Sequence, residues 1–123
     1  MDSVDVVVIG GGQSGLSAGY FLRRSGLSYV ILDAEASPGG AWQHAWHSLH
    51  LFSPAGWSSI PGWPMPASQG PYPARAEVLA YLAQYEQNMR CPFFALSACN
   101  ESATLASVCG WWPGTVGNGW RGR

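Results

Sequence analysis

A glycine-rich turn lies between a strand-like segment and a helix-like segment near the start of this chain and leaves few folds open to it. Val4–Ile9 is apolar and mostly β-branched, as in a buried parallel strand. Residues 10–15 then read G-x-G-x-x-G, and residues 16–24 continue with small residues along one helical face. Gly26 ends this helix, and residues 28–33 form a second strand-like run. These segments predict a β-α-β unit with parallel strands.

The turn has the spacing of a dinucleotide-binding site. Gly10 permits a tight turn, Gly12 lets the main chain approach a pyrophosphate, and Gly15 allows close contact between helix and strand. Gln13 and Ser14 complete the turn at the start of the helix, where free N–H groups and the positive dipole end attract an anion. All five are candidate cofactor-binding residues. The alternative is a turn that only connects a strand to a helix.

A carboxylate at the end of the second strand is the next expected part of such a site. Asp33 lies 23 residues after Gly10, where an acidic side chain accepts hydrogen bonds from ribose hydroxyls. Glu35 is a nearby competitor for this role, so both acids belong to the predicted site. The alternative for Asp33 is an ordinary strand end at the surface.

Composition limits the partners of the chain. It has 123 residues, enough for one small domain, and a net charge of −1 from six basic and seven acidic residues. This balance indicates neither a nucleic-acid surface nor a membrane surface. The N-terminus lacks the basic segment of a secretory signal, and the apolar run Val6–Ile9 is too short to cross a bilayer. A cytoplasmic location is therefore expected.

Histidine and cysteine do not form a metal-binding pattern. Three histidines spaced by three residues lie in a Pro- and Trp-rich stretch without a cysteine or carboxylate partner, so no metal site is expected. The three cysteines have no CxxC spacing, and their odd number argues against a disulfide framework. We expect free thiols. The residues are His44, His47, His50, Cys91, Cys99 and Cys109.

A long segment without helical periodicity separates the β-α-β unit from a second helix. Residues 36–74 are rich in Pro, Gly, Ser and Trp, and a loop of this length in a compact domain is usually functional or disordered. Its aromatic residues argue against disorder. Residues 75–90 have one apolar stripe and predict a helix. Ala74, just before it, lacks the side-chain oxygen of a good N-cap.

The segment after the second strand contains a second glycine pair, with Gly39, Gly40 and Trp42 in the order G-G-x-W. It resembles the GGxW element of the flavin-containing monooxygenase family, which includes bacterial flavoproteins of the CzcO type. Residues 46–54 resemble its W-x-x-L-x-L-x-[ST]-P stretch, and residues 72–82 its YPSRxEVxxYL helix start, with Ala in place of the usual Ser. A loop motif at 58–66 also matches, so the resemblance runs almost continuously over residues 4–87.

This resemblance implies FAD as the cofactor, with Gly39, Gly40 and Trp42 on its inner face. It implies an NAD(P)H-dependent oxidoreductase of the monooxygenase type, which transfers oxygen from a flavin peroxide to a small organic substrate or soft nucleophile. The partners are then O2 and a small molecule, and no catalytic acid, base or nucleophile is identified. The alternatives are a flavin reductase or dehydrogenase, and a truncated product without catalysis. Trp42 and the tryptophans that follow could also be core residues under the loop.

The tail fits nothing before it. Residues 88–123 contain all the cysteines and have no clear period, and the second Gly-rich turn of the family is absent from this chain. Reading the codons one frame over, with some third bases chosen freely, gives a string that alternates apolar and polar residues and resembles the family's continuation. We therefore expect the natural frame to be lost near Asn88.

The predicted fold class is α/β. It comprises a Rossmann-like FAD-binding β-α-β unit with an incomplete parallel sheet, then a long loop and a helix, and an irregular tail. In this division residues 1–87 are the N-terminal part of an FAD-binding domain, and residues 88–123 are an out-of-frame tail.

Overall fold

The computed structural model describes residues 4–90 and 93–95 of the chain. The three cysteines, and the predictions made for them, lie outside the described residues. The regular elements are four-residue strand β1, helix α1, strand β2, two 3-10 helices η1 and η2, helix α2 and strand β3. Their bounds are β1 Val6–Ile9, α1 Gln13–Ser25, β2 Tyr29–Asp33, η1 Gly40–His44, η2 Ala55–Trp57, α2 Arg75–Met89 and β3 Phe93–Ala95.

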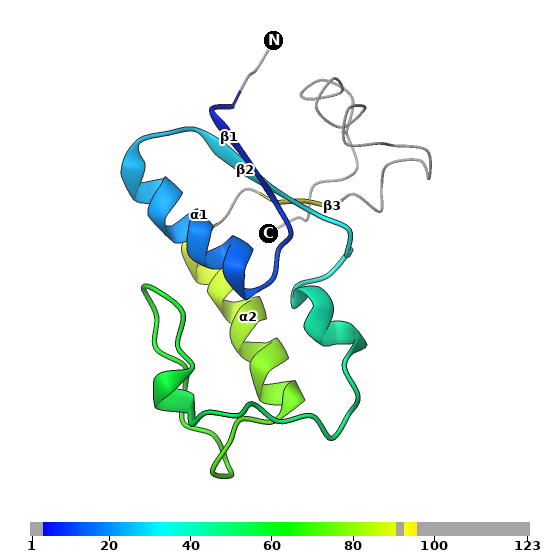
Figure 1. Ribbon diagram of the computed structural model, residues 1–123. Helices are drawn as coiled ribbons and strands as arrows, with labels where there is room; N and C mark the ends of the chain where they lie inside the picture. The colour runs from blue at the N-terminus through cyan, green and yellow to red at the C-terminus, as the bar shows by residue number, and fades with distance from the viewer. Residues whose placement is uncertain (1–3, 91–92, 96–123) are drawn as a thin grey trace.

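The three strands form one parallel sheet in the order β1-β2-β3, and α1 is the crossover between the first two strands (Figure 1). Val6 is aligned with Tyr29 between β1 and β2, and Ile31 with Phe93 between β2 and β3. Helix α1 contacts both β1 and β2 and also packs against α2. The predicted α/β class and the predicted β-α-β unit are confirmed.

The two strands of this unit differ in burial. In β2 the apolar side chains of Val30, Ile31 and Leu32 are buried, as predicted. In β1 the side chains alternate, and Val7 and Ile9 are 38% and 57% exposed. The prediction of a buried strand is therefore correct for β2 and wrong for β1. Among the described strands, β2 is paired on both sides and lies in the centre, whereas β1 is paired with β2 alone and lies at an edge, where its side chains are less covered.

Helix α1 begins three residues earlier than the apolar pattern indicated. Gly12 is its N-cap in an extended conformation, so Gln13 and Ser14 are the first two helical residues and both are exposed. At the other end Gly26 adopts a left-handed conformation with φ of 81°, which is the expected glycine C-cap.

The core lies between the sheet and α2. Helix α2 buries one stripe, which packs with Leu16 of α1 and Ile31 of β2. Two tyrosines of that stripe also hold the long loop in place. The Tyr81 hydroxyl accepts a hydrogen bond from the Ile60 N–H at 3.0 Å and donates one to the Trp63 carbonyl at 2.5 Å, and the Tyr85 hydroxyl donates to the carbonyl of Pro61. The stripe is Val78, Tyr81, Leu82 and Tyr85.

The start of α2 is stabilised by a carboxylate rather than by its N-cap side chain. Ala74 offers no side-chain acceptor, as expected. The Glu77 carboxylate accepts hydrogen bonds from the N–H groups of Ala74 at 2.8 Å and Gln69 at 2.9 Å. These backbone donors favour the charged carboxylate and lower the pKa of Glu77.

Regular structure continues past the predicted boundary at residue 87. Helix α2 runs through Met89, and β3 lies within the segment predicted to be irregular. The rest of the tail lies outside the described residues, so its reading frame stays a prediction.

None of the helices in the described part of the chain is both long and apolar enough to cross a membrane.

Candidate functional site

The predicted phosphate turn is an open main-chain corner between β1 and α1. Gly10 has φ of +102°, a left-handed conformation that favours glycine, and its N–H donates to the carbonyl of Leu32 in β2 at 2.7 Å. A Cβ atom built on Gly10 or on Gly12 would meet no atom within 4 Å. The space beside this backbone is therefore free at both positions, and it adjoins the N-terminus of a 13-residue helix.

Gly15 has a different role from the two open glycines. A Cβ atom built on it would overlap the carbonyl oxygen of Gly10, and Gly15 itself is buried. The absence of a side chain therefore lets α1 lie close against the end of β1, which is the role predicted from the spacing.

The second glycine pair lies directly against this turn. Gly39 and Gly40 are buried and have φ values of +117° and +53°. A Cβ atom built on Gly40 would lie 2.8 Å from the Cα atom and 3.1 Å from the nitrogen of Gly12. Gly12 and Gly40 are 28 residues apart in the sequence. The two glycine motifs nevertheless form one continuous main-chain surface. The sequence predicted both motifs, but not their contact.

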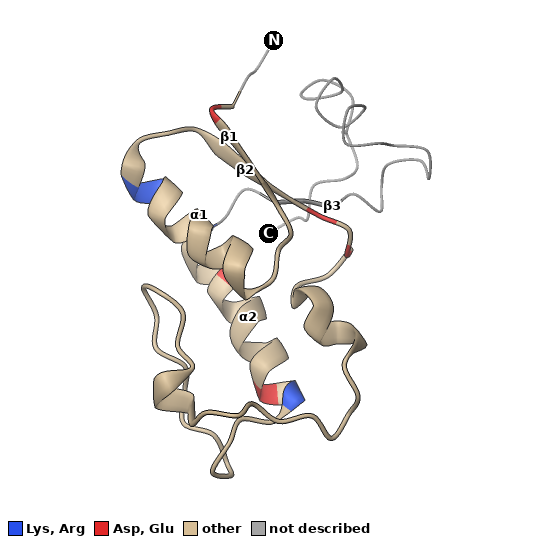
Figure 2. Cartoon of the chain, in the orientation of Figure 1, with Lys and Arg blue, Asp and Glu red and all other residues tan. Residues whose placement is uncertain are grey.

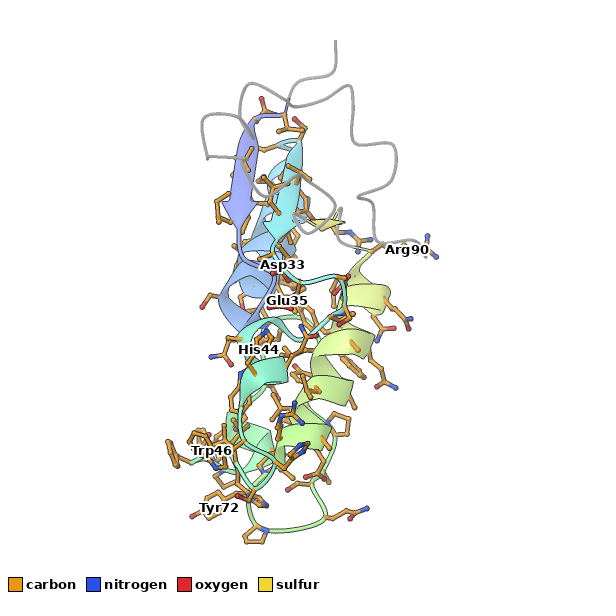
Figure 3. All side chains as sticks on the ribbon, turned by 90° about the vertical axis from the view of Figure 1, so that its right-hand side faces the viewer. Asp33, Glu35, His44, Trp46, Tyr72 and Arg90 are labelled. Atoms are coloured by element: carbon orange, nitrogen blue, oxygen red, sulfur yellow. The ribbon has the colours of Figure 1, made fainter. Side chains whose placement is uncertain are left out.

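The two candidate acids have separate surroundings. Asp33 ends β2 and is only 5% exposed, and its Oδ1 accepts a hydrogen bond from the Glu35 N–H at 3.3 Å. The Glu35 carboxylate lies 2.5 Å from Nε2 of His44 in η1. Figure 3 shows Asp33 and Glu35 following the end of the strand, with His44 close to Glu35. The strand-end position beside the turn therefore belongs to Asp33, and Glu35 faces η1.

The tryptophans of the long loop divide into two groups. Trp42 and Trp63 are partly buried and pack against the core, as the core alternative expected. Trp46 and Trp57 are 65% and 86% exposed. Trp46 also contributes to an open hollow of about 470 Å³ lined mainly by apolar and aromatic side chains, which lies away from Asp33 in Figure 3. The residues around this hollow are Trp46, Ser48, Leu49, His50, Leu51, Phe52 and Tyr72.

Two residues of the site were not singled out from the sequence. The Gln43 amide donates to the carbonyls of Ser37 at 3.0 Å and Gly40 at 3.2 Å. The Arg75 guanidinium donates from Nε to the carbonyl of Trp42 at 3.1 Å and from Nη2 to that of Gln43 at 2.6 Å. Arg75 does lie in the YPSRxEV-like motif, but its partners are 32 and 33 residues away, which no local pattern reveals.

The charges of the described residues do not form a single patch. Arg23 and Arg24 end α1 and Arg75 begins α2, so these cations lie at separate places on the molecule (Figure 2).

Within residues 4–90 and 93–95 there is no group of three His, Cys, Asp or Glu side chains that could hold a metal ion. The candidate site as described combines bare main chain, a helix N-terminus and the buried carboxylate of Asp33.

The fold and sequence of this site recur in a solved protein. A flavin-containing monooxygenase from Stenotrophomonas maltophilia is 95% identical with a TM-score of 0.73, over 76% of this chain and 28% of that one. The chain belongs to the flavin-containing monooxygenase-like family. In agreement with this family, the model of the NAD(P)-binding Rossmann-like domain matches residues 8–56, which include both glycine motifs.

Other members of the family match more distantly. The uncharacterized oxidoreductase CzcO of Bacillus subtilis is 36% identical over 88 residues, which are 72% of this chain and 26% of that protein. The indole-3-pyruvate monooxygenase YUCCA4 of Oryza sativa is 33% identical over 69% of this chain and 20% of its own length. The chain thus spans about a quarter or less of the curated relatives it matches.

Proposed function

We propose that this chain binds FAD as the N-terminal part of an NAD(P)H-dependent flavin monooxygenase. The observation that carries the proposal is the contact between the two glycine motifs. Gly40 lies against Gly12, and a Cβ atom at Gly10 or Gly12 would enter open space beside the start of α1. A diphosphate fits a corner of this kind because it needs free N–H groups, a positive dipole end and no side chains in the way.

Each predicted site residue has a place in this proposal. The main chain of Gly10 and Gly12 surrounds the diphosphate, and the N–H groups of Gln13 and Ser14 face it from the first helical turn. Gly15 supports them by letting the helix approach the strand. Only backbone groups are used at these positions, and a side chain on Gly10 or Gly12 would enter the space assigned to the diphosphate.

The remaining residues are assigned to the two ends of the cofactor. Asp33 accepts hydrogen bonds from the ribose, and Glu35 fixes η1 beside it through His44. Gly39 and Gly40 approach the cofactor on the flavin side, with Trp42 packed behind them on the core. When bound, FAD supplies the redox chemistry by which NAD(P)H is oxidised and one atom of O2 enters a small substrate while the other leaves as water.

The names of the relatives support the finer parts of this proposal. A steroid monooxygenase bound to NADP is 25% identical with a TM-score of 0.63, over 75% of this chain. We accordingly propose NAD(P)H, O2 and a small organic or soft-nucleophile molecule as partners of the complete enzyme. We also propose a cytoplasmic location without a nucleic-acid or membrane partner.

A second candidate is a flavin reductase that transfers no oxygen. It is favoured by the bacillithiol disulfide reductase of Staphylococcus aureus, which is 25% identical with a TM-score of 0.66. The two candidates differ in stoichiometry, because a monooxygenase consumes one O2 for each oxygenated product. A third candidate, a non-catalytic truncated product, is consistent with the exposed apolar side chains Ile9, Phe52 and Trp57.

The first experiment is expression of the 123-residue chain, incubation with FAD and desalting. We expect a flavin absorbance spectrum in the protein fraction at close to one FAD per chain. A soluble, folded chain that elutes without flavin would contradict the proposed function. Oxygen uptake coupled to product formation, measured in the 95% identical S. maltophilia enzyme, separates the monooxygenase from the reductase.

We also propose the domain division at residue 87, with residues 88–123 out of frame. The alignment with B. subtilis CzcO covers 88 residues of this chain, whereas the alignment with the indole-3-pyruvate monooxygenase YUCCA6 of Arabidopsis thaliana covers 108, so the proposal rests on the change of composition after residue 87. The nucleotide sequence through codon 88 and beyond tests it. A frameshift near this codon is the expected result, whereas an uninterrupted frame with the same tail in related genes would contradict it.

A further inference from the structure

One arginine joins the start of α2 to the end of η1. The Arg75 guanidinium donates from Nη2 to the Gln43 carbonyl at 2.6 Å and from Nε to the Trp42 carbonyl at 3.1 Å. Both acceptors lie near the C-terminal end of η1, where the helix dipole favours a positive charge, and the Trp42 carbonyl also accepts a hydrogen bond from the Ala45 N–H at 3.3 Å. The arginine is half-buried, so water competes with these bonds less than at an exposed site.

The other end of the same short helix is the cofactor-facing glycine pair. Gly40 is the first residue of η1 and lies against Gly12. The Trp42 N–H donates to the Gly39 carbonyl at 3.2 Å, and Gln43 donates to the carbonyl of Gly40. The five residues of η1 therefore connect the arginine to the diphosphate turn through a single hydrogen-bonded unit.

We propose that Arg75 is a positioning residue for the FAD site: by holding the carbonyl end of η1, it sets the backbone of Gly40 against Gly12. This inference rests on the proposed FAD binding. In this proposal the arginine acts through η1 and not as a ligand of the cofactor. It acts by fixing the second glycine pair before FAD arrives, so that binding does not have to order this segment.

Packing from α2 supports the same role. A Cβ atom built on Gly39 would lie 2.5 Å from Cδ2 of Leu79, which is one helical turn after Arg75. The first turns of α2 thus act on η1 at both ends. Leu79 packs against the glycine pair, and Arg75 bonds the carbonyls at the opposite end of η1. Two consecutive glycines have many accessible backbone conformations, so contacts from α2 are needed to hold this pair in one of them.

The test compares Arg75→Ala with Arg23→Ala. Arg23 is a matched control because its Nη1 also donates to a distant carbonyl, that of Met89, at 2.7 Å, but at the far end of α2. For Arg75→Ala we expect the dissociation constant for FAD to rise roughly tenfold to a hundredfold, the range for losing a hydrogen bond to a charged group. For Arg23→Ala we expect a change of less than about threefold.

A second readout needs no cofactor. Hydrogen–deuterium exchange of residues 40–45 should accelerate in Arg75→Ala and stay unchanged in Arg23→Ala, because η1 loses its brace only in the first variant. Arg75→Lys keeps the charge but not the two-pronged geometry, so it should restore part of the protection and part of the affinity.

The outcomes separate the two proposals. If the unchanged chain binds FAD but Arg75→Ala binds it equally well, or if exchange over residues 40–45 does not change, Arg75 is not a positioning residue. If both arginine variants lose FAD affinity to the same extent with equal losses of stability, its role is only structural and the inference fails. If the folded, unchanged chain does not bind FAD, the proposed function fails and this inference fails with it.

Discussion

Replacing Gly40 with alanine tests the contact between the two glycine motifs without any cofactor. The new Cβ atom would lie 2.8 Å from the Cα atom of Gly12 and 3.1 Å from its nitrogen. Both neighbours are main-chain atoms of the phosphate turn, so no flexible side chain can move aside. Gly40 also has φ of +53°, a conformation that L-residues adopt at a cost.

The expected loss of stability follows from these two terms. The left-handed conformation costs about 1–2 kcal/mol in a residue with a Cβ atom. Inserting a methyl group into a closely packed site costs about 1–3 kcal/mol more. The free energy of unfolding should therefore fall by about 2–5 kcal/mol. In a domain of this size each kcal/mol corresponds to about 4–8 °C, so Tm should fall by at least about 8 °C.

Thermal unfolding followed by circular dichroism measures this change, and Gly56→Ala is the matched control. Gly56 lies in η2, where a built Cβ atom meets nothing within 4 Å. Its substitution should alter the free energy of unfolding by no more than about 0.5 kcal/mol. If Gly40→Ala and Gly56→Ala had the same Tm, the contact of Gly40 with Gly12 would not exist in solution and the described site would be wrong.

Two further predictions concern α2. Replacing Glu77 with glutamine should reduce stability at neutral pH; because the folded pKa of Glu77 is lowered, the deficit should persist above its ordinary pKa of 4.5 and disappear as the pH falls below that value. Urea unfolding of both proteins from pH 7 to pH 3 measures this gap, and a gap that grows on acidification would contradict the assignment. Tyr81→Phe removes the hydroxyl that forms hydrogen bonds with Ile60 and Trp63, so the free energy of unfolding should fall by about 1–3 kcal/mol. A loss below about 0.5 kcal/mol would show that this hydroxyl does not hold the loop.

The parts of the fold that the sequence predicted are those determined by local pattern. The run of β-branched residues, the glycine spacing and the small residues of the first helix each act over a few positions, so β1, the turn and α1 were expected. The aromatic stripe of α2 was expected in the same way. The limits were shifted by one to three residues, most at the start of α1, where Gln13, Ser14 and Gly15 carry no apolar helical pattern.

The parts that escaped prediction depend on contacts between distant segments. The exposure of Val7 and Ile9 depends on β1 being an edge strand, which periodicity cannot show. The contact of Gly40 with Gly12 and the bonds from Arg75 to η1 join segments about 30 residues apart. The different surroundings of the two acids also depend on distant contacts, since Asp33 ends the strand and Glu35 pairs with His44; which of them binds the ribose stays a prediction.

In the proposed complex the bare main chain of Gly12 faces the diphosphate of FAD, so the FAD affinity of Gly12→Ala is the decisive measurement. Gly12 has an extended conformation with φ of −80°, and an added Cβ atom meets no protein atom within 4 Å. Alanine should therefore fold with a loss of no more than about 1 kcal/mol, the difference expected at a helix N-cap. FAD titration should nevertheless show an affinity at least about tenfold lower than that of the unchanged chain. Equal FAD affinities in two equally folded proteins would contradict the account.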